Sequence, residues 1–209
     1  MPRAATLLTI SLMLLVATAL PILATERIVV NDLNGVKVAP IGGSSDAAIM
    51  PPKSGANRHA ARRATVLIFI TTDCPIANAC APEIERIYRA YAPKQIGFYL
   101  VYVDASQTAK AVRKHHDEYG YTCPAVLDSE HKLVNRAQAL VTPEAAIFAP
   151  DGRLLYHGRI DDRAVAFGQV RSHPTSHDLR DVLDAYLQRK PIPVSSTKAV
   201  GCFISDLRR

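Results

Sequence analysis

An uninterrupted apolar run at residues 66–70 predicts a strand that is buried on both faces. Two threonines and Asp73 end this strand. From Ile84 onward, apolar residues recur at the i, i+3, i+4 and i+7 spacing that is typical of an amphipathic helix. Cys74 therefore lies where a buried strand passes into a helix.

The remaining pattern alternates between short strands and amphipathic helices. An Asn34-Gly35 turn predicts an N-terminal hairpin over residues 26–42, and a stretch rich in small residues predicts a loop over residues 42–60. Further strands are predicted at residues 96–103, 125–127, 145–148 and 154–156, the last two flanking the turn Pro150-Asp151-Gly152. Helices are predicted at residues 106–119 with Ser106 as N-cap, 133–139 and 177–188. This order predicts an α/β fold, with a central mixed β-sheet flanked by helices on both faces.

Residues 1–24 differ in composition from the predicted core. Arg3 is followed by an apolar stretch at residues 7–20 and by a small residue at its end, which is typical of a cleaved signal peptide. The alternative is an uncleaved membrane anchor, because residues 4–25 carry no charge and are long enough to span a bilayer; Pro21 favours cleavage. Both alternatives predict an exported protein, periplasmic or otherwise extracytoplasmic, in which disulfides persist.

One domain with two appendages is expected after this leader. Residues 25–60 form the hairpin and loop, residues 61–190 the domain, and residues 191–209 a C-terminal tail that contains Cys202. A hydrophobic content of 48% in 209 residues is enough for a sizeable core. The net charge of +6 comes from scattered basic residues without interleaved aromatics. No nucleic-acid partner is therefore expected, and contact with a membrane only through the leader.

Cys74 is the first candidate for chemistry. Unpaired N–H groups at a helix start carry positive partial charge and stabilise a thiolate, which is the reactive form of cysteine. Pro75 fits the first helical position, because an N–H there has no helical partner. Thr71 is placed to hydrogen-bond the sulfur or an incoming peroxide, whereas the charge of Asp73 opposes the thiolate. The alternative is a buried structural cysteine.

The residues around Cys74 carry a family resemblance. Cys74 followed eight positions later by Pro82 resembles the active-site strand and first helix of the thioredoxin fold. Ala77 stands where the second cysteine of a C-x-x-C pair would fall. Thr71-x-x-Cys74 resembles the threonine and peroxidatic cysteine of peroxiredoxins, with Leu67 in place of the usual proline.

Two further motifs extend this resemblance over roughly residues 60–205, namely Thr142-Pro143-Glu144 before a predicted strand and a Gly201-Cys202 ending. The chain resembles the redoxins, thioredoxin-fold proteins related to alkyl hydroperoxide reductase and thiol-specific antioxidant proteins. The resemblance implies a thioredoxin fold with the N-terminal hairpin as an extension. It also implies a cis Thr142-Pro143 bond that faces the active cysteine and offers a substrate backbone a docking position.

Arg159 is the third candidate for substrate binding, beside Thr142 and Pro143. A guanidinium near the cysteine would polarise a peroxide or stabilise the thiolate. The alternative for Arg159 is a surface salt bridge with Asp161 or Asp162.

Three other cysteines are candidates for the partner of Cys74. Cys202 is favoured as the resolving cysteine, because its tail can swing in and because redoxins of this type commonly end in a Gly-Cys pair. Cys80 is the second candidate, although an intact helix places it nearly two turns from Cys74, out of disulfide reach. Cys123 is expected in the core or in a structural bridge. Four cysteines allow three full pairings, which the sequence leaves open.

Together these features predict an exported thiol-dependent oxidoreductase that reduces peroxides or exchanges disulfides through Cys74, with an external thiol as reductant and no cofactor. One alternative is a thioredoxin-fold binding module whose cysteines are structural. Another is a copper-binding protein that holds Cu(I) through Cys74 and Cys80, because thiolates are suitable Cu(I) ligands. The histidines have no cysteine at metal-site spacing, so no other metal site is expected.

Overall fold

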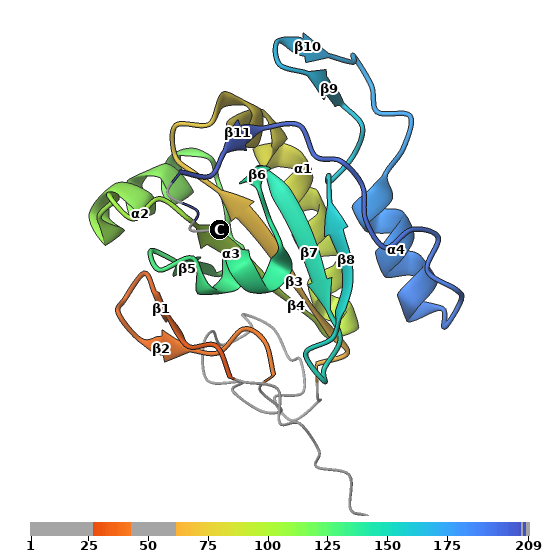
Figure 1. Ribbon diagram of the computed structural model, residues 1–209, viewed down its shortest axis with the longest axis horizontal. Helices are drawn as coiled ribbons and strands as arrows, with labels where there is room; N and C mark the ends of the chain where they lie inside the picture. Colours follow the sequence, from red (N-terminus) through yellow and green to blue (C-terminus); the bar gives the residue numbers. More distant parts are fainter. Residues whose placement is uncertain (1–26, 43–61, 206, 208–209) are drawn as a thin grey trace, which may run out of the picture.

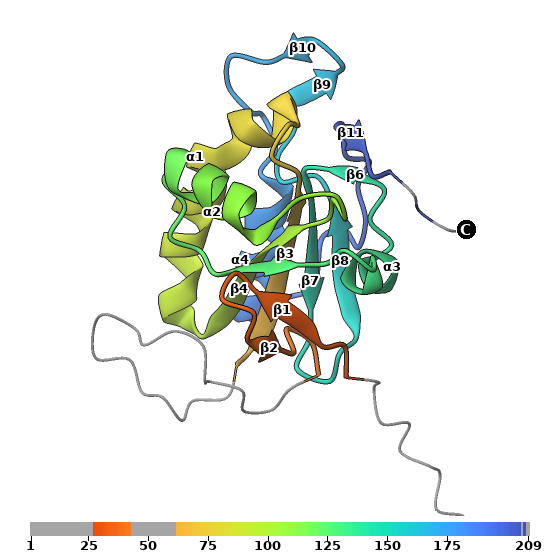
Figure 2. The same ribbon diagram turned by 90° about the vertical axis from the view of Figure 1, so that its left-hand side faces the viewer.

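The computed structural model describes residues 27–42, 62–205 and 207 (Figure 1). The predicted leader, and the predicted loop from residue 43 onward, lie outside these residues. The described chain forms a mixed β-sheet with helices on both faces, as the apolar pattern predicted (Figure 2). Among the helices of the described residues, none has the length and apolar character that a membrane span needs.

The apolar run that predicts a buried strand lies near the middle of the sheet. It forms β3 (Ala64–Ile70), in which all seven residues are buried. β3 is parallel to β4 (Ile96–Tyr102) on one side and antiparallel to β7 (Glu144–Phe148) on the other. The order of the seven strands is β2-β1-β5-β4-β3-β7-β8. A strand covered on both faces is apolar at successive positions, which is why the sequence could reveal this one.

The sheet has an antiparallel hairpin at each of its two edges, and its outer strands are short. The N-terminal hairpin is present as predicted, and its first strand also pairs with β5. The second hairpin joins β7 to β8. The outer strands are β1 (Val30–Asp32), β2 (Lys37–Val38), β5 (Ala125–Leu127) and β8 (Leu154–Gly158).

Helices cover the two faces of the sheet unequally. Successive side chains of a strand point to opposite faces. The even-numbered residues of β3 pack against three helices, α1 (Pro75–Tyr91), α2 (Ala109–Glu118) and α4 (Asp178–Leu187). The opposite face packs against α3 (Lys132–Ala137), the N-terminal hairpin and Ile204 of the tail. A short 3-10 helix, η1 (Ala92–Lys94), follows α1.

The second helix begins later than the sequence predicts. Ser106 is the predicted N-cap, but α2 begins after Thr108, whose hydroxyl oxygen accepts a 3.2 Å hydrogen bond from the N–H of Ala111. Ser106 instead donates its hydroxyl to Asp104 Oδ1 at 2.7 Å, in the loop before the helix. Serine and threonine are both good caps, so the path of this loop decides between them.

Two small sheets lie outside the central one, and the sequence predicts neither of them. β9 (Ala164–Ala166) and β10 (Gln169–Val170) form an exposed hairpin. β6 (Val141–Thr142) pairs with β11 (Cys202–Phe203), so the C-terminal tail is docked on the domain. Figure 1 shows this tail running from α4 past β8 to β11. The tail thus brings Cys202 to the sheet end that carries Cys74.

Candidate active site

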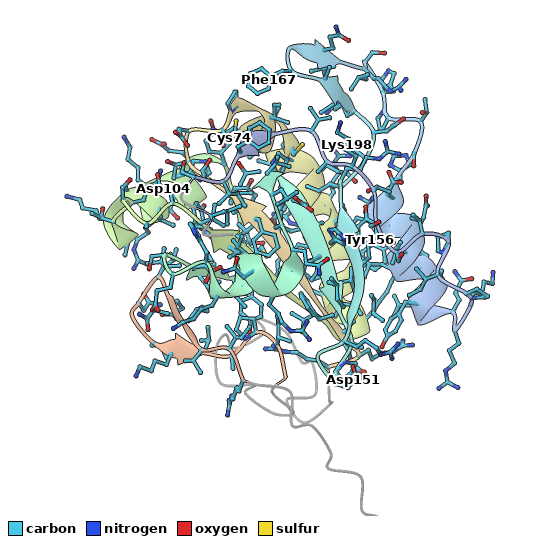
Figure 3. All side chains as sticks on the ribbon, viewed as in Figure 1. Cys74, Asp104, Asp151, Tyr156, Phe167 and Lys198 are labelled. Carbon is cyan, nitrogen blue, oxygen red and sulfur yellow. The ribbon has the colours of Figure 1, made fainter. Side chains whose placement is uncertain are left out.

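Cys74 is the N-cap of α1, where the sequence predicts a strand-to-helix junction. Its backbone is extended (φ −76°, ψ 109°), and its sulfur accepts a 3.4 Å hydrogen bond from the N–H of Ala77. Pro75 follows at the start of the helix, where no N–H is needed. The Cys74 residue is only 1% exposed, and the tail crosses the sheet end at which it lies (Figure 3). The predicted position of this cysteine is confirmed.

Cys202 lies against Cys74 because β11 pairs with β6. In this pairing Cys202 is opposite Thr142, and the Cys74 thiol donates to the Thr142 carbonyl oxygen at 2.9 Å. Cys202 hydrogen-bonds to the Cys74 sulfur through both its thiol and its backbone N–H. A Cβ atom on Gly201 would lie 2.1 Å from the Thr142 oxygen, so only glycine fits there. The Gly-Cys ending therefore has a physical reason, since the glycine permits the close approach of the cysteine.

The two thiols have opposite shifts in acidity. Burial acts to raise the pKa of Cys74, but hydrogen bonds from the Cys202 thiol, from Thr142 and from backbone N–H groups bring it below the ordinary value of 9.0. Burial, the contact with Cys74 and the charge of Asp73 raise the pKa of Cys202 to about 12. Near neutral pH, the site thus favours a thiolate on Cys74 over one on Cys202.

Both sulfurs line one cavity of about 130 Å³. Its wall includes the predicted Thr71, together with His131 and Phe203, which the sequence analysis does not select. His131 is buried, and its Nε2 donates to the Val103 carbonyl oxygen at 2.8 Å. A carbonyl only accepts hydrogen bonds, so His131 Nε2 carries a proton. No spacing in the sequence points to His131, because only the fold brings it to this cavity.

A chain of polar groups, partly or fully buried, supports the loop before Cys74. Asn78 donates from Nδ2 to the Thr72 carbonyl oxygen at 3.0 Å, and its Oδ1 lies 2.9 Å from His115 Nε2. His115 Nδ1 is 2.9 Å from the Tyr102 hydroxyl. Burial lowers the pKa of His115, which favours a neutral ring that donates to Asn78 and accepts from Tyr102. These are positioning residues that the sequence analysis does not select.

Cys80 does not line the cavity that contains Cys74 and Cys202. It lines a second cavity with Pro143, Arg159 and Asp161, and Cys74 is not part of that wall. Burial raises the pKa of Cys80 to about 12, and the charge of Asp161 contributes to the rise. α1 is continuous from Pro75 through Cys80, so the helical separation predicted between the two cysteines is present.

The remaining cysteine, Cys123, is fully buried in the core, where burial raises its pKa well above the ordinary value. All four cysteines are free thiols in this structure. Among residues 27–42, 62–205 and 207, no group of three or more His, Cys, Asp or Glu residues is arranged to hold a metal ion. The two cysteines of the copper alternative, Cys74 and Cys80, line separate cavities.

Arg159 does not line the cavity of Cys74, contrary to one sequence prediction. Its Nε lies 2.7 Å from Oδ2 of Asp178, at the start of α4. The predicted alternative partners are also wrong, because Asp162 pairs instead with Arg171 at 3.4 Å and Asp161 lies with Arg159 only in the wall of the Cys80 cavity. Any contact of Arg159 with substrate stays a prediction, confined to the Cys80 side.

The Thr142-Pro143 peptide bond is cis, as predicted. The next residue, Glu144, is buried, and its Oε2 accepts hydrogen bonds from the N–H groups of Leu140 at 2.9 Å and Val141 at 3.3 Å. The Thr-Pro-Glu motif therefore shapes the loop that carries β6. Thr142 contacts Cys74 and Pro143 lines the Cys80 cavity, while the substrate-binding role of both residues stays a prediction.

Comparison with known proteins supplies the family. Residues 56–157 match the AhpC/TSA family. This chain is a thioredoxin-like redoxin of AhpC/TSA type. The matched segment of the redoxin includes Cys74, Cys80, Cys123 and the Thr-Pro-Glu motif, whereas Cys202 lies beyond it.

Solved structures show the same fold. A hypothetical protein of Sinorhizobium meliloti has a TM-score of 0.66 at 21% identity, over 86% of this redoxin and 90% of that protein. An uncharacterized conserved protein of Geobacillus kaustophilus has a TM-score of 0.65 at 24% identity, over 86% and 88%. The exposed lipoprotein thioredoxin of Streptococcus pneumoniae has a TM-score of 0.51 at 14% identity, over 78% and 99%. These likenesses confirm the predicted thioredoxin fold; no curated protein sequence matches the redoxin.

Proposed function

We propose that this redoxin is an exported thiol-dependent oxidoreductase, in which Cys74 reduces a peroxide or exchanges a disulfide and Cys202 resolves the product. The observation that carries the proposal is the hydrogen-bonded pair of thiols at one cavity, one with a lowered and one with a raised pKa. Such a pair places the nucleophilic thiolate on one sulfur and the proton on the other. Thr71, in the same cavity, is proposed to hydrogen-bond the incoming peroxide.

With a peroxide, the chemistry has two steps. The Cys74 thiolate attacks one peroxide oxygen, the O–O bond breaks, and the leaving oxygen takes a proton and departs as an alcohol or as water. Cys74 is then a sulfenic acid. The Cys202 sulfur attacks the Cys74 sulfur, the hydroxyl leaves with the Cys202 proton as water, and a Cys74–Cys202 disulfide forms. The cysteine pair thereby gives two electrons to the peroxide.

An external dithiol would return this disulfide to the reduced state. Its thiolate attacks one sulfur of the disulfide, the other sulfur leaves, and the dithiol ends as a disulfide. Cys202 is partly exposed, whereas Cys74 is 1% exposed. A thiol of lower pKa also leaves more readily, and Cys74 has the lower pKa. Both facts favour attack on Cys202.

A peptide map tests the proposal directly. The reduced protein is exposed to one equivalent of hydrogen peroxide, quenched within seconds by an alkylating reagent in denaturant, so that buried thiols also react, and digested without reduction. We expect a Cys74–Cys202 disulfide and alkylated Cys80 and Cys123. A Cys74–Cys80 disulfide would reassign the resolving residue. An unoxidised Cys74 would exclude peroxide as the substrate and leave disulfide exchange, which the same map follows with a low-molecular-weight disulfide as oxidant.

The export of the redoxin is proposed from the composition of residues 1–24. Sequencing the N-terminus of the mature protein from separated cell fractions tests it. A start near residue 25 in an extracytoplasmic fraction is the expected result, and an intact Met1 in the cytoplasm would contradict it. An intact leader in the membrane fraction would show the uncleaved anchor.

A further inference from the structure

The strand that holds Cys202 occupies a backbone edge beside the nucleophile. β6 consists of Val141 and Thr142, and within the described residues its strand partner is β11. An exposed strand edge binds an extended peptide by forming main-chain hydrogen bonds with it. Here the chain's own tail fills that position, at the residue whose carbonyl accepts the Cys74 thiol.

The tail is fixed on both sides of Cys202. Before it, the N–H of Thr197 donates to the His157 carbonyl oxygen at 3.1 Å, and the Thr197 hydroxyl lies 2.7 Å from the Tyr156 hydroxyl. After it, the N–H of Ile204 donates to the Leu140 carbonyl oxygen at 3.0 Å. The Ile204 residue is 6% exposed and belongs to the core. A segment held at both ends stays in place between them.

Two glycines permit this path. A Cβ atom on Gly158 would lie 2.3 Å from Thr197 Oγ1, and one on Gly201 would lie 2.1 Å from the Thr142 oxygen. Both distances are too short for any side chain. The chain thus has a glycine at two points where the tail comes very close to the domain, which a loosely held tail would not require.

We propose that the docked tail restricts Cys74 to small hydroperoxides and keeps polypeptide disulfides out, an inference that rests on the proposed thiol chemistry. A polypeptide disulfide needs a free backbone edge beside the cysteine and space around the sulfur. The edge is occupied, and Cys74 is 1% exposed. The remaining approach is the cavity of about 130 Å³ that Cys74 shares with Thr71 and His131. It has room for a few molecules the size of water, so hydrogen peroxide and short alkyl hydroperoxides fit.

The test compares three full-length proteins that all carry Cys202→Ser, so that the first reaction of Cys74 is measured alone. The first has no other change, and the second adds Gly201→Ala to disturb the pairing of β11 with β6. The third adds Ser196→Ala, a control at an exposed side chain of the same tail. A Cys74→Ser blank accounts for the other thiols.

Each reduced protein is treated separately with two probes. One is hydrogen peroxide, followed by mass spectrometry of the sulfenic acid trapped with dimedone. The other is an extended peptide of seven residues whose single cysteine carries a thiopyridyl group. The Cys74 thiolate attacks the peptide sulfur, the S–S bond breaks, and the released pyridine-2-thione is followed by its absorbance. The readout is the ratio of the peptide rate to the peroxide rate.

We expect Gly201→Ala to raise this ratio by about tenfold or more, because a docked tail leaves the edge open in about a tenth of the molecules or fewer. Ser196→Ala should leave the ratio unchanged. Equal ratios in all three proteins would overturn the inference. If circular dichroism shows that Gly201→Ala does not fold, Thr197→Val replaces it, because it removes the hydroxyl contacts without adding volume. A ratio unchanged in that variant also overturns the inference.

The same experiment separates this inference from the proposed function. If no protein forms a sulfenic acid, peroxide reduction is refuted. A peptide rate that Gly201→Ala still increases would then support exclusion of polypeptides by the tail.

Discussion

The first helix of this redoxin carries two cysteines in opposite surroundings. Cys74, at its N-terminus, meets the Cys202 thiol and Thr142, and its pKa lies below the ordinary value. Cys80, less than two turns further along α1, is half-buried and lines a separate cavity with Asp161, and its pKa rises to about 12. Burial acts to raise the pKa of both thiols, so the difference comes from the hydrogen bonds to Cys74 and from the charge of Asp161 beside Cys80.

The comparison also separates the two candidates for the resolving residue. Cys80 is near Cys74 in the sequence, but the continuous helix holds its side chain in the wall of another cavity. Cys202 is far from Cys74 in the sequence, but a two-residue strand brings the two thiols into hydrogen-bond contact. The lowered pKa of Cys74 depends more on the strand pairing that brings Cys202 to it than on the start of the helix that Cys74 and Cys80 share.

The largest expected effect comes from removing the nucleophile. Cys74→Ser should reduce thiol-dependent peroxide consumption by about 10³-fold or more, because a serine hydroxyl does not ionise at neutral pH. Cys80→Ser is the matched control on the same helix and should keep nearly full activity. The measurement is peroxide consumption with dithiothreitol as reductant. An equal loss in both variants would abolish the distinction between the two cysteines.

Removal of the proposed resolving residue should have the next largest effect. Cys202→Ser should lower steady-state turnover by about tenfold or more, because an external thiol must then replace one held beside Cys74. The first oxidation should still occur, so a sulfenic acid on Cys74 should accumulate and be trapped by dimedone. Normal turnover without trapped sulfenic acid would show that another residue resolves Cys74.

A pH series should separate the thiols without removing any of them. Alkylation by iodoacetamide follows the thiolate fraction, so labelling of Cys74 should reach half its maximal rate below pH 9. Cys80 and Cys202, with pKa values of about 12, should remain largely unlabelled at that pH. Cys202→Ala removes a donor to the thiolate and should move the Cys74 midpoint to higher pH. Slow labelling of Cys74 across neutral pH would favour a binding module with structural cysteines.

The smallest expected effect concerns the residues that position the loop before Cys74. Asn78→Ala removes the hydrogen bond to the Thr72 carbonyl oxygen and should cost about 1–2 kcal/mol in the free energy of unfolding, measured with urea. It should also move the pH midpoint of Cys74 alkylation, since the sulfur follows the loop. Arg86→Ala, at an exposed position of the same helix, is the control. A stability loss with an unchanged midpoint would restrict Asn78 to a structural role.

The sequence predicts the position of Cys74 well, because the patterns that indicate it are local. The uninterrupted apolar run of β3 and the helical spacing of α1 are enough to place Cys74 at a helix start. The cis Thr142-Pro143 bond and the contact with Cys202 followed from the family resemblance, because β6 and β11 have two residues each and carry no periodicity.

Other features of the site arise only from tertiary packing. His131, Asn78 and His115 have no shared motif, and they reach the site on three different elements. Arg159 has two acids close by in the sequence, but α4 brings Asp178 into ion-pair contact with it instead. A prediction from sequence neighbours cannot anticipate which distant element packs against a side chain.

The pairing of β11 with β6 also affects the stability of the whole domain. A disulfide between Cys74 and Cys202 closes a loop of roughly 130 residues, which includes the four α-helices of the described chain. In the chain-entropy description, a cross-link over such a loop destabilises the unfolded chain by about 4–5 kcal/mol. The oxidised protein should therefore resist urea more strongly than the reduced one. By the same linkage, the folded domain makes its own disulfide harder to reduce, so its reductant must have a correspondingly low potential.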